Sequence, residues 1–258
     1  THCISSAASD VYKRQIQIIK NLRDQVQSLR EMWTGRTPAG IPMVPDELTE
    51  AAFYGREDVA ALLDEGKVPL GLDLETVEPV TWDLKKGNLL YLTDKEEQMT
   101  QFVKQIARSK QKVIVLAPAY NELPEMEGVT ILSTKEDYVA GIKKMEENIQ
   151  LRLEQQKSQH EATIVLYNQL ELMNDLSMDL QSSLNYVLEK GTRAGYATVA
   201  MSGSQLNRKI DEVSKSIKLY KQAIVAMRIT DQSVLNVINR PVPVSYTHLR
   251  AHETREDL

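Results

Sequence analysis

The 258-residue sequence contains one cysteine, Cys3, and this scarcity limits the chemistry that the chain can carry. A single thiol cannot form an intramolecular disulfide, and it cannot supply the several sulfur ligands of a structural zinc site. A chain without a disulfide framework suits a reducing compartment, so we expect a cytoplasmic location.

Long apolar runs and an excess of basic charge are also missing. No run of 18 or more apolar residues occurs, and the chain does not open with a charged, then apolar, then small-residue pattern, so we expect neither a membrane span nor a signal peptide. The sequence has 31 Lys and Arg residues against 36 Asp and Glu residues, interspersed, with a net charge of −5. Because no basic stripe is available to neutralise a phosphate backbone, we expect no nucleic-acid partner.

The two ends of the sequence, residues 1–15 and 245–258, resemble translated sequencing adapters, and we treat them as non-native flanks. They contain Cys3 and three of the four histidines, which leaves His160 as the one interior histidine, in a polar loop where we expect it to be exposed. Without a cluster of Cys, His, Asp and Glu at ligand spacing, we expect no metal site.

Residues 16–34 show apolar side chains at steps of three and four, which predicts an amphipathic helix. These side chains are Ile19, Leu22, Val26, Leu29 and Trp33. We interpret this segment as a linker helix from a preceding domain. Two prolines in the stretch 40–46 forbid a regular helix there, so we place a boundary near residue 35 and assign residues 35–244 to one domain.

Within this domain the pattern changes from a hairpin to strands that alternate with helices. Residues 69–84 contain two alternating runs around a polar turn, which predicts a β-hairpin at an edge of the fold. A capping-box sequence, Ser133 to Glu136, predicts the start of a long helix to about Gln155. Strands separated by helices imply an α/β fold with a mainly parallel sheet covered on both faces. The predicted strands are residues 88–93, 113–118, 129–132, 163–167, 197–200 and 223–227.

Four sequence segments in this order resemble the FtsK/SpoIIIE family of P-loop motors, and more closely the C-terminal ATPase domain of the EssC-type proteins of type VIIb secretion. The segments are Trp33-Thr34-Gly35, residues 41–49 (IPMVPDELT), residues 69–80 (PLGLDLETVEPV) and Thr192-Arg193-Ala194-Gly195. The resemblance spans roughly residues 15–244. It implies a RecA-like P-loop NTPase fold.

The phosphate-binding motif of that family, G-x-x-x-x-G-K-[ST], has a degenerate counterpart in this sequence. Its backbone amides cradle phosphates, its lysine meets the β- and γ-phosphates, and its hydroxyl holds magnesium. The matching register replaces both glycines and puts methionine at the lysine position, so that only the last hydroxyl remains. The register comprises Thr93, Asp94, Lys95, Glu96, Glu97, Gln98, Met99 and Thr100.

Acidic side chains further oppose phosphate binding at this loop. Asp94, Glu96 and Glu97 lie where the helix dipole would attract an anion, and we expect them to fill that position. The simpler interpretation is that Thr93 or Asp94 is an ordinary N-cap followed by acidic residues. Lys95 could replace the missing lysine, although a solvated side chain is the simpler expectation.

The acidic pair that follows a later strand in these motors also has a degenerate counterpart, Asn168 and Gln169. In the family an Asp holds magnesium through water and a Glu orients the attacking water, whereas neither amide can act as a carboxylate base. On its own Asn-Gln is an ordinary polar strand end. Together with the altered loop, it favours an inactivated Walker B pair. The resemblance also places Arg193 where a neighbouring subunit's nucleotide could be sensed; the alternative is a salt bridge.

The resemblance therefore implies a degenerate, non-hydrolysing ATPase domain of a type VII secretion coupling protein, without catalytic residues of its own. It implies adjacent ATPase domains and secreted WXG100-type proteins as partners, and a cytoplasmic location in a parent protein anchored in the cell membrane. We do not expect ATP to bind in the usual way. The alternative is an ATP-binding and hydrolysing motor domain with a non-standard P-loop, as in FtsK/SpoIIIE-like translocases; a DNA translocase is disfavoured by the acidic charge.

Overall fold

The structure is a computed structural model that describes residues 22–32, 43–45, 48–84 and 87–227. The chain divides into two compact units, residues 1–42 and 43–258, each considered by itself. In the first unit residues 22–32 are helical, as the apolar spacing predicts, and Leu22, Val26 and Leu29 are exposed. The rest of the predicted linker helix, the boundary near residue 35 and both flanks lie outside the described residues.

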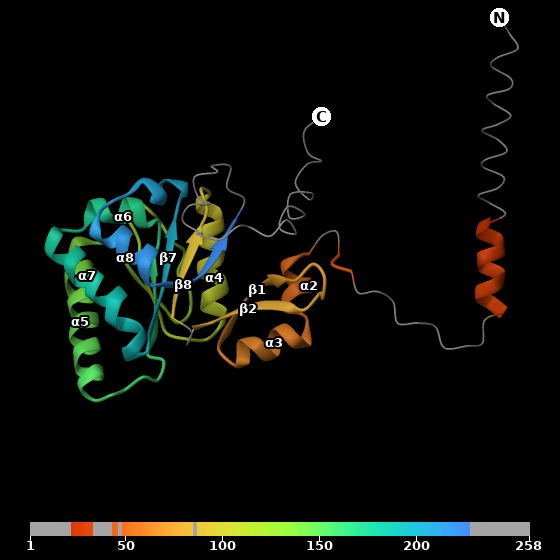
Figure 1. Ribbon diagram of the computed structural model, residues 1–258, viewed down its shortest axis with the longest axis horizontal. Helices are drawn as coiled ribbons and strands as arrows, with labels where there is room; N and C mark the ends of the chain where they lie inside the picture. Colours follow the sequence, from red (N-terminus) through yellow and green to blue (C-terminus); the bar gives the residue numbers. More distant parts are fainter. Residues whose placement is uncertain (1–21, 33–42, 46–47, 85–86, 228–258) are drawn as a thin grey trace, which may run out of the picture. The chain divides into compact units, whose positions relative to one another are not determined.

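The second unit contains a six-stranded sheet in which every pairing is parallel, in the order β5-β4-β6-β7-β3-β8 (Figure 1). Long apolar runs predict such strands because both faces of a parallel sheet are covered. All residues of β3 and β6 are buried. The strands are β3 (Asn88–Leu92), β4 (Val113–Leu116), β5 (Val129–Leu132), β6 (Ala162–Leu166), β7 (Tyr196–Ser202) and β8 (Lys221–Ala226).

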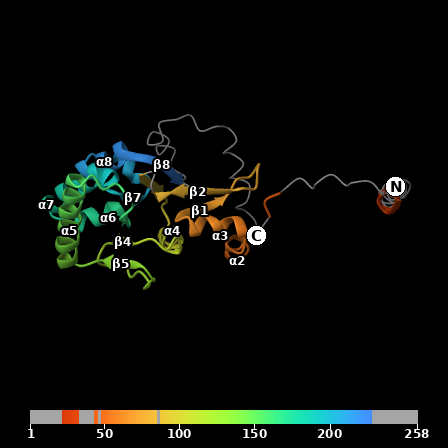
Figure 2. The same cartoon turned by 90° about the horizontal axis from the view of Figure 1, so that it is seen from below.

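Two groups of helices cover opposite faces of this sheet, as Figures 1 and 2 show. Alternate side chains of β3 enter two different cores: Leu90 and Leu92 join one with α5, α7 and α8, whereas Leu89 and Tyr91 join the other with α4. The helices are α4 (Glu96–Arg108), α5 (Lys135–Glu154), α6 (Gln169–Asp175), α7 (Met178–Lys190) and α8 (Glu212–Tyr220). The predicted fold with helices on both faces is therefore confirmed.

The long helix α5 begins with a capping box, one residue later than the sequence pattern predicts. Thr134 is the N-cap, and its side chain accepts a hydrogen bond from the backbone N–H of Asp137. The carboxylate of Asp137 in turn accepts from the backbone N–H of Thr134. The prediction of Ser133 with Glu136 was wrong by one position, because Thr134 and Asp137 have the same spacing.

The predicted β-hairpin is present, with β1 (Lys67–Leu72) antiparallel to β2 (Pro79–Asp83). It forms a two-stranded sheet separate from the six-stranded one. Two short helices that the sequence did not predict, α2 (Glu50–Tyr54) and α3 (Glu57–Asp64), precede it. Val68 and Trp82 of the hairpin are buried in the core on the α4 face, so this subregion packs as part of the same unit.

The strand order creates two topological switch points at the carboxyl edge of the sheet. The chain leaves β3 through α4 on one face, whereas it leaves the neighbouring strand β7 through α8 on the other. The same reversal separates β4, whose connection to β5 packs on the α4 face, from β6, which continues into α6 and α7. Ligands of open α/β sheets bind outside the carboxyl ends of strands at such switch points. A ligand site is therefore expected among the residues that follow β3, β4, β6 and β7.

Candidate functional site

The connection from β3 to α4 is only three residues long, Thr93, Asp94 and Lys95. A phosphate-binding loop places its eight-residue motif between the strand and the helix. Here α4 begins at Glu96, so Gln98 and the two residues after it are already helical. Among the described residues other than glycine, positive φ occurs at Val77, Lys110, Gln156 and Asn168. Thr93 and Gln98, at the two positions where the family motif has glycine, therefore have ordinary backbone angles.

The N-cap of α4 is Lys95, with φ −109° and ψ 119°, and its side chain makes no capping hydrogen bond. The interpretation of Thr93 or Asp94 as the N-cap is therefore wrong. The hydroxyl of Thr93 accepts a hydrogen bond from Lys95 N at 3.1 Å and donates to Oε1 of Gln98. These two hydrogen bonds of Thr93 stabilise the short connection between β3 and α4.

Asp94 stabilises a different segment from the one predicted. Its Oδ1 accepts a hydrogen bond of 2.7 Å from the backbone N–H of Ser204, the first residue of the 3-10 helix η3 (Ser204–Arg208). Thr93 N also donates to Ser202 O at 3.0 Å. A Cβ atom on Gly203 would lie 2.9 Å from Asp94 Oδ1, so a larger residue there would have to displace the Asp94 carboxylate. These contacts join the segments that follow β3 and β7. Of the three predicted carboxylates, Glu96 and Glu97 lie in the first turn of α4 and Asp94 does not.

Met99 and Thr100 stand where the family motif has its lysine and its magnesium-binding hydroxyl, and both side chains make contacts inside the fold. Met99 is 4% exposed and belongs to the core between α4 and the sheet. The hydroxyl of Thr100 lies 2.8 Å from that of Tyr167, directly after β6. Since Tyr167 donates to the carbonyl of Glu96 at 3.3 Å, Thr100 is the donor within the hydroxyl pair. Burial raises the pKa of Tyr167, which keeps this phenol neutral.

The predicted Walker B amides enter two separate hydrogen-bond groups. Asn168 is the N-cap of α6 in a left-handed conformation, with φ 44°, and its Nδ2 donates to the hydroxyl of Tyr120 at 3.2 Å. Gln169 is fully buried, donates to Oγ of Ser214 in α8 at 3.2 Å and accepts from Oγ of Ser202 at 3.3 Å. Gln169 therefore joins β7 to α8 through buried hydrogen bonds.

Arg193 lies in the 3-10 helix η2 (Gly191–Ala194), which precedes β7. This is the amino edge of the sheet, opposite the β3–α4 connection. Arg193 forms no ion pair within the part of the chain that the structure describes. The role of sensing a neighbouring nucleotide stays a prediction.

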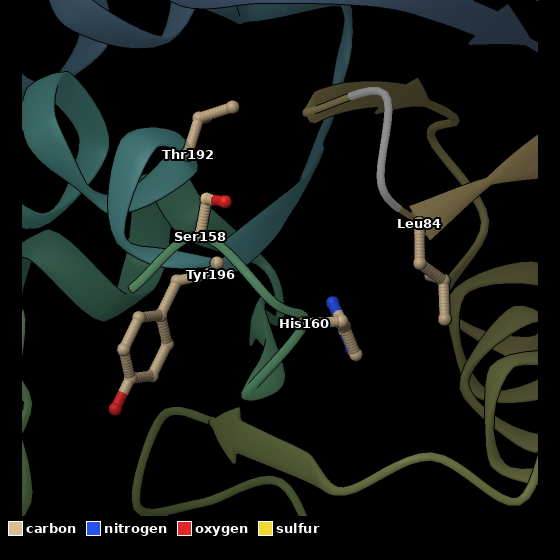
Figure 3. A pocket seen from close by; sticks show the side chains of 6 residues that line it. Leu84, Ser158, His160, Thr192 and Tyr196 are labelled. Carbon is tan, nitrogen blue, oxygen red and sulfur yellow. The ribbon is translucent and has the colours of Figure 1, made fainter. Parts of the chain in front are cut away.

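A small cavity of about 30 Å³ opens at the same amino edge (Figure 3). The imidazole of His160 faces into it, so this residue is half-buried and not exposed as the sequence predicts. The cavity has room for about one water molecule, which makes it too small for a cofactor. Its lining comprises Leu84, Ser158, His160, Thr192, Gly195 and Tyr196.

Three consecutive residues after β4 form contacts that the sequence did not predict. Ala119 N donates to Oδ2 of Asp175 at 3.2 Å, Tyr120 accepts from Asn168, and Nδ2 of Asn121 donates to Oε1 of Glu96. Burial and the carboxylates of Glu171, Glu96 and Asp175 together raise the pKa of Tyr120. Acidic groups of α4 and α6 thus lie near this turn, at the carboxyl ends of β4 and β6.

Neither a metal site nor a membrane span is evident in the described ranges. No group of three or more His, Cys, Asp or Glu side chains there could hold a metal ion. No helix within these ranges is both long and apolar enough to cross a membrane.

Comparison with known proteins gives one consistent likeness. No family model matches the chain. The type VII secretion system protein EssC of Staphylococcus aureus strain MRSA252 is 25% identical over 231 residues, which cover 86% of this chain and 16% of that protein. ATPases 2 and 3 of EssC from Geobacillus thermodenitrificans align with a TM-score of 0.65 and 19% identity, over 81% of this chain and 43% of the other. ATPases 2 and 3 of EccC from Thermomonospora curvata, solved with a signal sequence peptide, align with a TM-score of 0.57 and 17% identity, over 81% and 41% of the two chains.

These likenesses confirm the RecA-like α/β fold and the resemblance to EssC-type type VII secretion ATPases. The chain corresponds to about a sixth of the length of the curated relative, since it covers 16% of it. It covers less than half of either solved chain, each of which contains two ATPase domains.

Proposed function

We propose that this chain is a non-hydrolysing ATPase-fold domain of a type VII secretion coupling protein, which acts in substrate recruitment and in coupling between neighbouring domains. The observation that carries the proposal is the three-residue connection between β3 and α4. A phosphate grip needs several backbone N–H groups that curve around the anion. A connection this short, with Thr93 N bonded to Ser202 O, does not provide that curve.

The side chains around this connection support the same conclusion. Met99 is buried among apolar residues, and the hydroxyl of Thr100 is held by Tyr167. Gln169 is buried between β7 and α8, where an attacking water would have no access to it. The three side chains therefore stabilise the fold, and no general base or magnesium ligand remains at the register positions.

We propose adjacent ATPase domains of the same parent protein as the first partners, because the solved relatives carry two ATPases in one chain. Secreted proteins of the WXG100 type are the second proposed partners, and the solved EccC relative holds a signal sequence peptide. The proposed place is the cytoplasmic side of a membrane-anchored parent protein. We propose no nucleic-acid partner, because the net charge of −5 opposes attraction of a phosphate backbone.

Isothermal titration of the full chain with MgATP tests the proposal directly. We expect no saturable heat, and we expect phosphate release no faster than in buffer alone. Stoichiometric binding together with turnover on the order of 1 s⁻¹ or faster, the ordinary range of enzymes, would overturn the proposal.

In the alternative, a motor with a non-standard loop, either Lys95 or a basic residue of a neighbouring subunit would have to stabilise the phosphate charge, and Lys95 is the one that this chain supplies. It is exposed at the start of α4. If ATP does bind, Lys95→Ala should abolish binding in the motor alternative, because its ammonium would neutralise phosphate charge. Lys157→Ala is the matched control, since Lys157 is equally exposed in the loop before β6, at the other edge of the sheet. Equal effects of both substitutions would indicate unspecific attraction of the nucleotide by surface charge.

A further inference from the structure

The helix of residues 22–32 in the first unit carries apolar side chains on one face, and these side chains are exposed (Figure 1). Leu22, Val26 and Leu29 are 54%, 50% and 62% exposed, and we call these three residues the apolar seam. A helix of this length is marginal in water on its own, and most helical stability in proteins comes from packing of an apolar face. The apolar seam therefore requires a packing partner.

The sequence of this helix repeats with a period of seven residues. The triplet Leu-Arg-acid stands at residues 22–24 and again at residues 29–31. This spacing places both leucines at the d position of a heptad and Val26 at the a position between them, and the sequence has Ile19 at the preceding a position. A β-branched residue at a with leucine at d favours a parallel coiled coil of two strands. The pattern thus indicates a second helix of the same kind as the partner.

The charged side chains of the helix agree with a parallel pair of identical helices. Arg23 and Arg30 stand at e, beside the apolar seam, whereas Asp24 and Glu31 stand at f, on the far side of the helix. In a parallel pair each e position faces a g position of the other helix, so Arg30 faces Gln25, whose amide oxygen can accept from it. In an antiparallel pair e faces e, and Arg23 would face Arg30 with repulsion of like charges. The charges therefore select the parallel orientation.

An open groove lies beside the apolar seam, and a side chain of a second helix can insert into it. Its lining comprises Leu22, Arg23, Val26, Gln27 and Arg30. Leu22, Arg23 and Val26 have the spacing of three corners of the four-residue hole that receives a d-position side chain in a coiled coil. The alkyl stem of Arg23 can cover the inserted side chain while its guanidinium stays in water. Leu22 of a second copy thus suits this groove.

We infer that two copies of this chain pair through the apolar seam as a parallel coiled coil. Because the two helices run in the same direction, both copies continue into their second units from the same end of the seam. The heptad pattern is only about two repeats long, so the pairing is weak, with a dissociation constant on the order of 10 µM. This interaction surface is separate from the β3–α4 connection and does not depend on ATP.

Sedimentation equilibrium of the full chain tests the pairing. Between about 2 and 200 µM chain, mass action should raise the weight-average mass from that of one 29.2 kDa chain towards that of two. A chain that stays monomeric over this range would overturn the inference and leave the apolar seam to a helix of another protein. Trimers or tetramers would also overturn it, because the residues at a and d favour two strands.

Substitutions locate the pairing on the apolar seam. The double variant Leu22→Ser and Leu29→Ser should weaken pairing about tenfold or more, because each copy loses both d-position side chains. Leu219→Ser is the matched control, since Leu219 in α8 is 72% exposed, and we expect pairing to be unchanged. Thermal unfolding by circular dichroism checks that the second unit stays folded in each variant. An equal loss of pairing in the control would refute the location.

Cysteine cross-linking tests the orientation, in a chain that also carries Cys3→Ser. Leu22→Cys alone should form a disulfide between two chains under mild oxidation, because a parallel pair brings the two copies of this position side by side. An antiparallel pair would instead join Leu22→Cys to Leu29→Cys when the two variants are mixed. Cross-linking in the mixture alone would overturn the parallel pairing.

The outcomes separate the inference from the proposed function. If the chain is monomeric and does not bind MgATP, the inference fails while the proposed function stands. If the chain hydrolyses ATP and also pairs through the apolar seam, the proposed function fails and the inference stands.

Discussion

Met99→Lys restores the residue type that P-loop motors carry at this position, and it tests where the side chain points. In the structure Met99 is 4% exposed on the face of α4 that packs against the sheet, together with Phe102, Val103 and Ile106. A lysine there would enter an apolar core and not a phosphate site. We therefore expect Met99→Lys to destabilise the domain without conferring ATP binding.

The magnitude follows from burial. Removal of a buried methionine side chain costs about 2 to 5 kcal/mol, and the alkyl stem of lysine replaces part of that packing. Against this gain stands the cost of holding an ammonium group close to apolar surface, so we expect a net loss of about 3 kcal/mol. In a domain of this size 1 kcal/mol shifts Tm by about 2 to 4 °C, which gives a fall of about 6 to 12 °C.

Thermal and urea unfolding followed by circular dichroism measure this loss, and titration with MgATP measures any gain of binding. Met99→Leu is the control, because a similar apolar volume should cost less than about 1.5 kcal/mol. If Met99→Lys melted within about 2 °C of the unaltered chain and bound MgATP, the side chain would reach the phosphate position. The assignment of α4 and its core would then be wrong.

Two further predictions concern buried hydroxyl groups. Tyr167→Phe leaves Thr100 without its partner and should lower the free energy of unfolding by about 1 to 2 kcal/mol in urea titration; the loss should shrink when Thr100 is already valine, and an equal loss in both backgrounds would contradict the pairing. Burial raises the pKa values of Tyr91 and Tyr138 to about 12, above the ordinary value of about 10. Because the neutral phenols are favoured in the folded state, stability should be intact below pH 10 and fall as the pH rises towards 12. The double variant Tyr91→Phe and Tyr138→Phe should show a weaker fall in Tm over this range, and an unchanged slope would count against the cause.

The strands and the long helices could be predicted from the sequence because each has a local signal of sufficient length. The apolar runs of β3, β4 and β6 are buried on both faces, which is the condition that selects such runs. Helix α5 has 20 residues and its own capping box. Helices α2, α3, α6 and α8 have between 5 and 9 residues, too few for a clear period of 3.6, and these were missed.

The candidate site could be predicted only in part, because the positions of its side chains depend on contacts between segments that are distant in the sequence. The sequence indicated correctly that the segment after β3 lacks glycine and has Met99 where the family motif has lysine, but the register assumed a loop of family length. The actual length follows from α4, which begins at Glu96. The destinations of Asp94 and Thr100 are set by Ser204 and Tyr167, which lie 110 and 67 residues away. No local pattern carries that information.

The two switch points of the sheet differ in the contacts that the chain's own groups make there. Beside β3, Asp94 accepts a hydrogen bond from the backbone N–H of Ser204, so the segments that follow β3 and β7 are joined directly. Beside β6, the turn after β4 takes no part in that contact, and Tyr120 is exposed. Because the order of the strands places β7 between β3 and β6, the contact of Asp94 belongs to the first switch point alone.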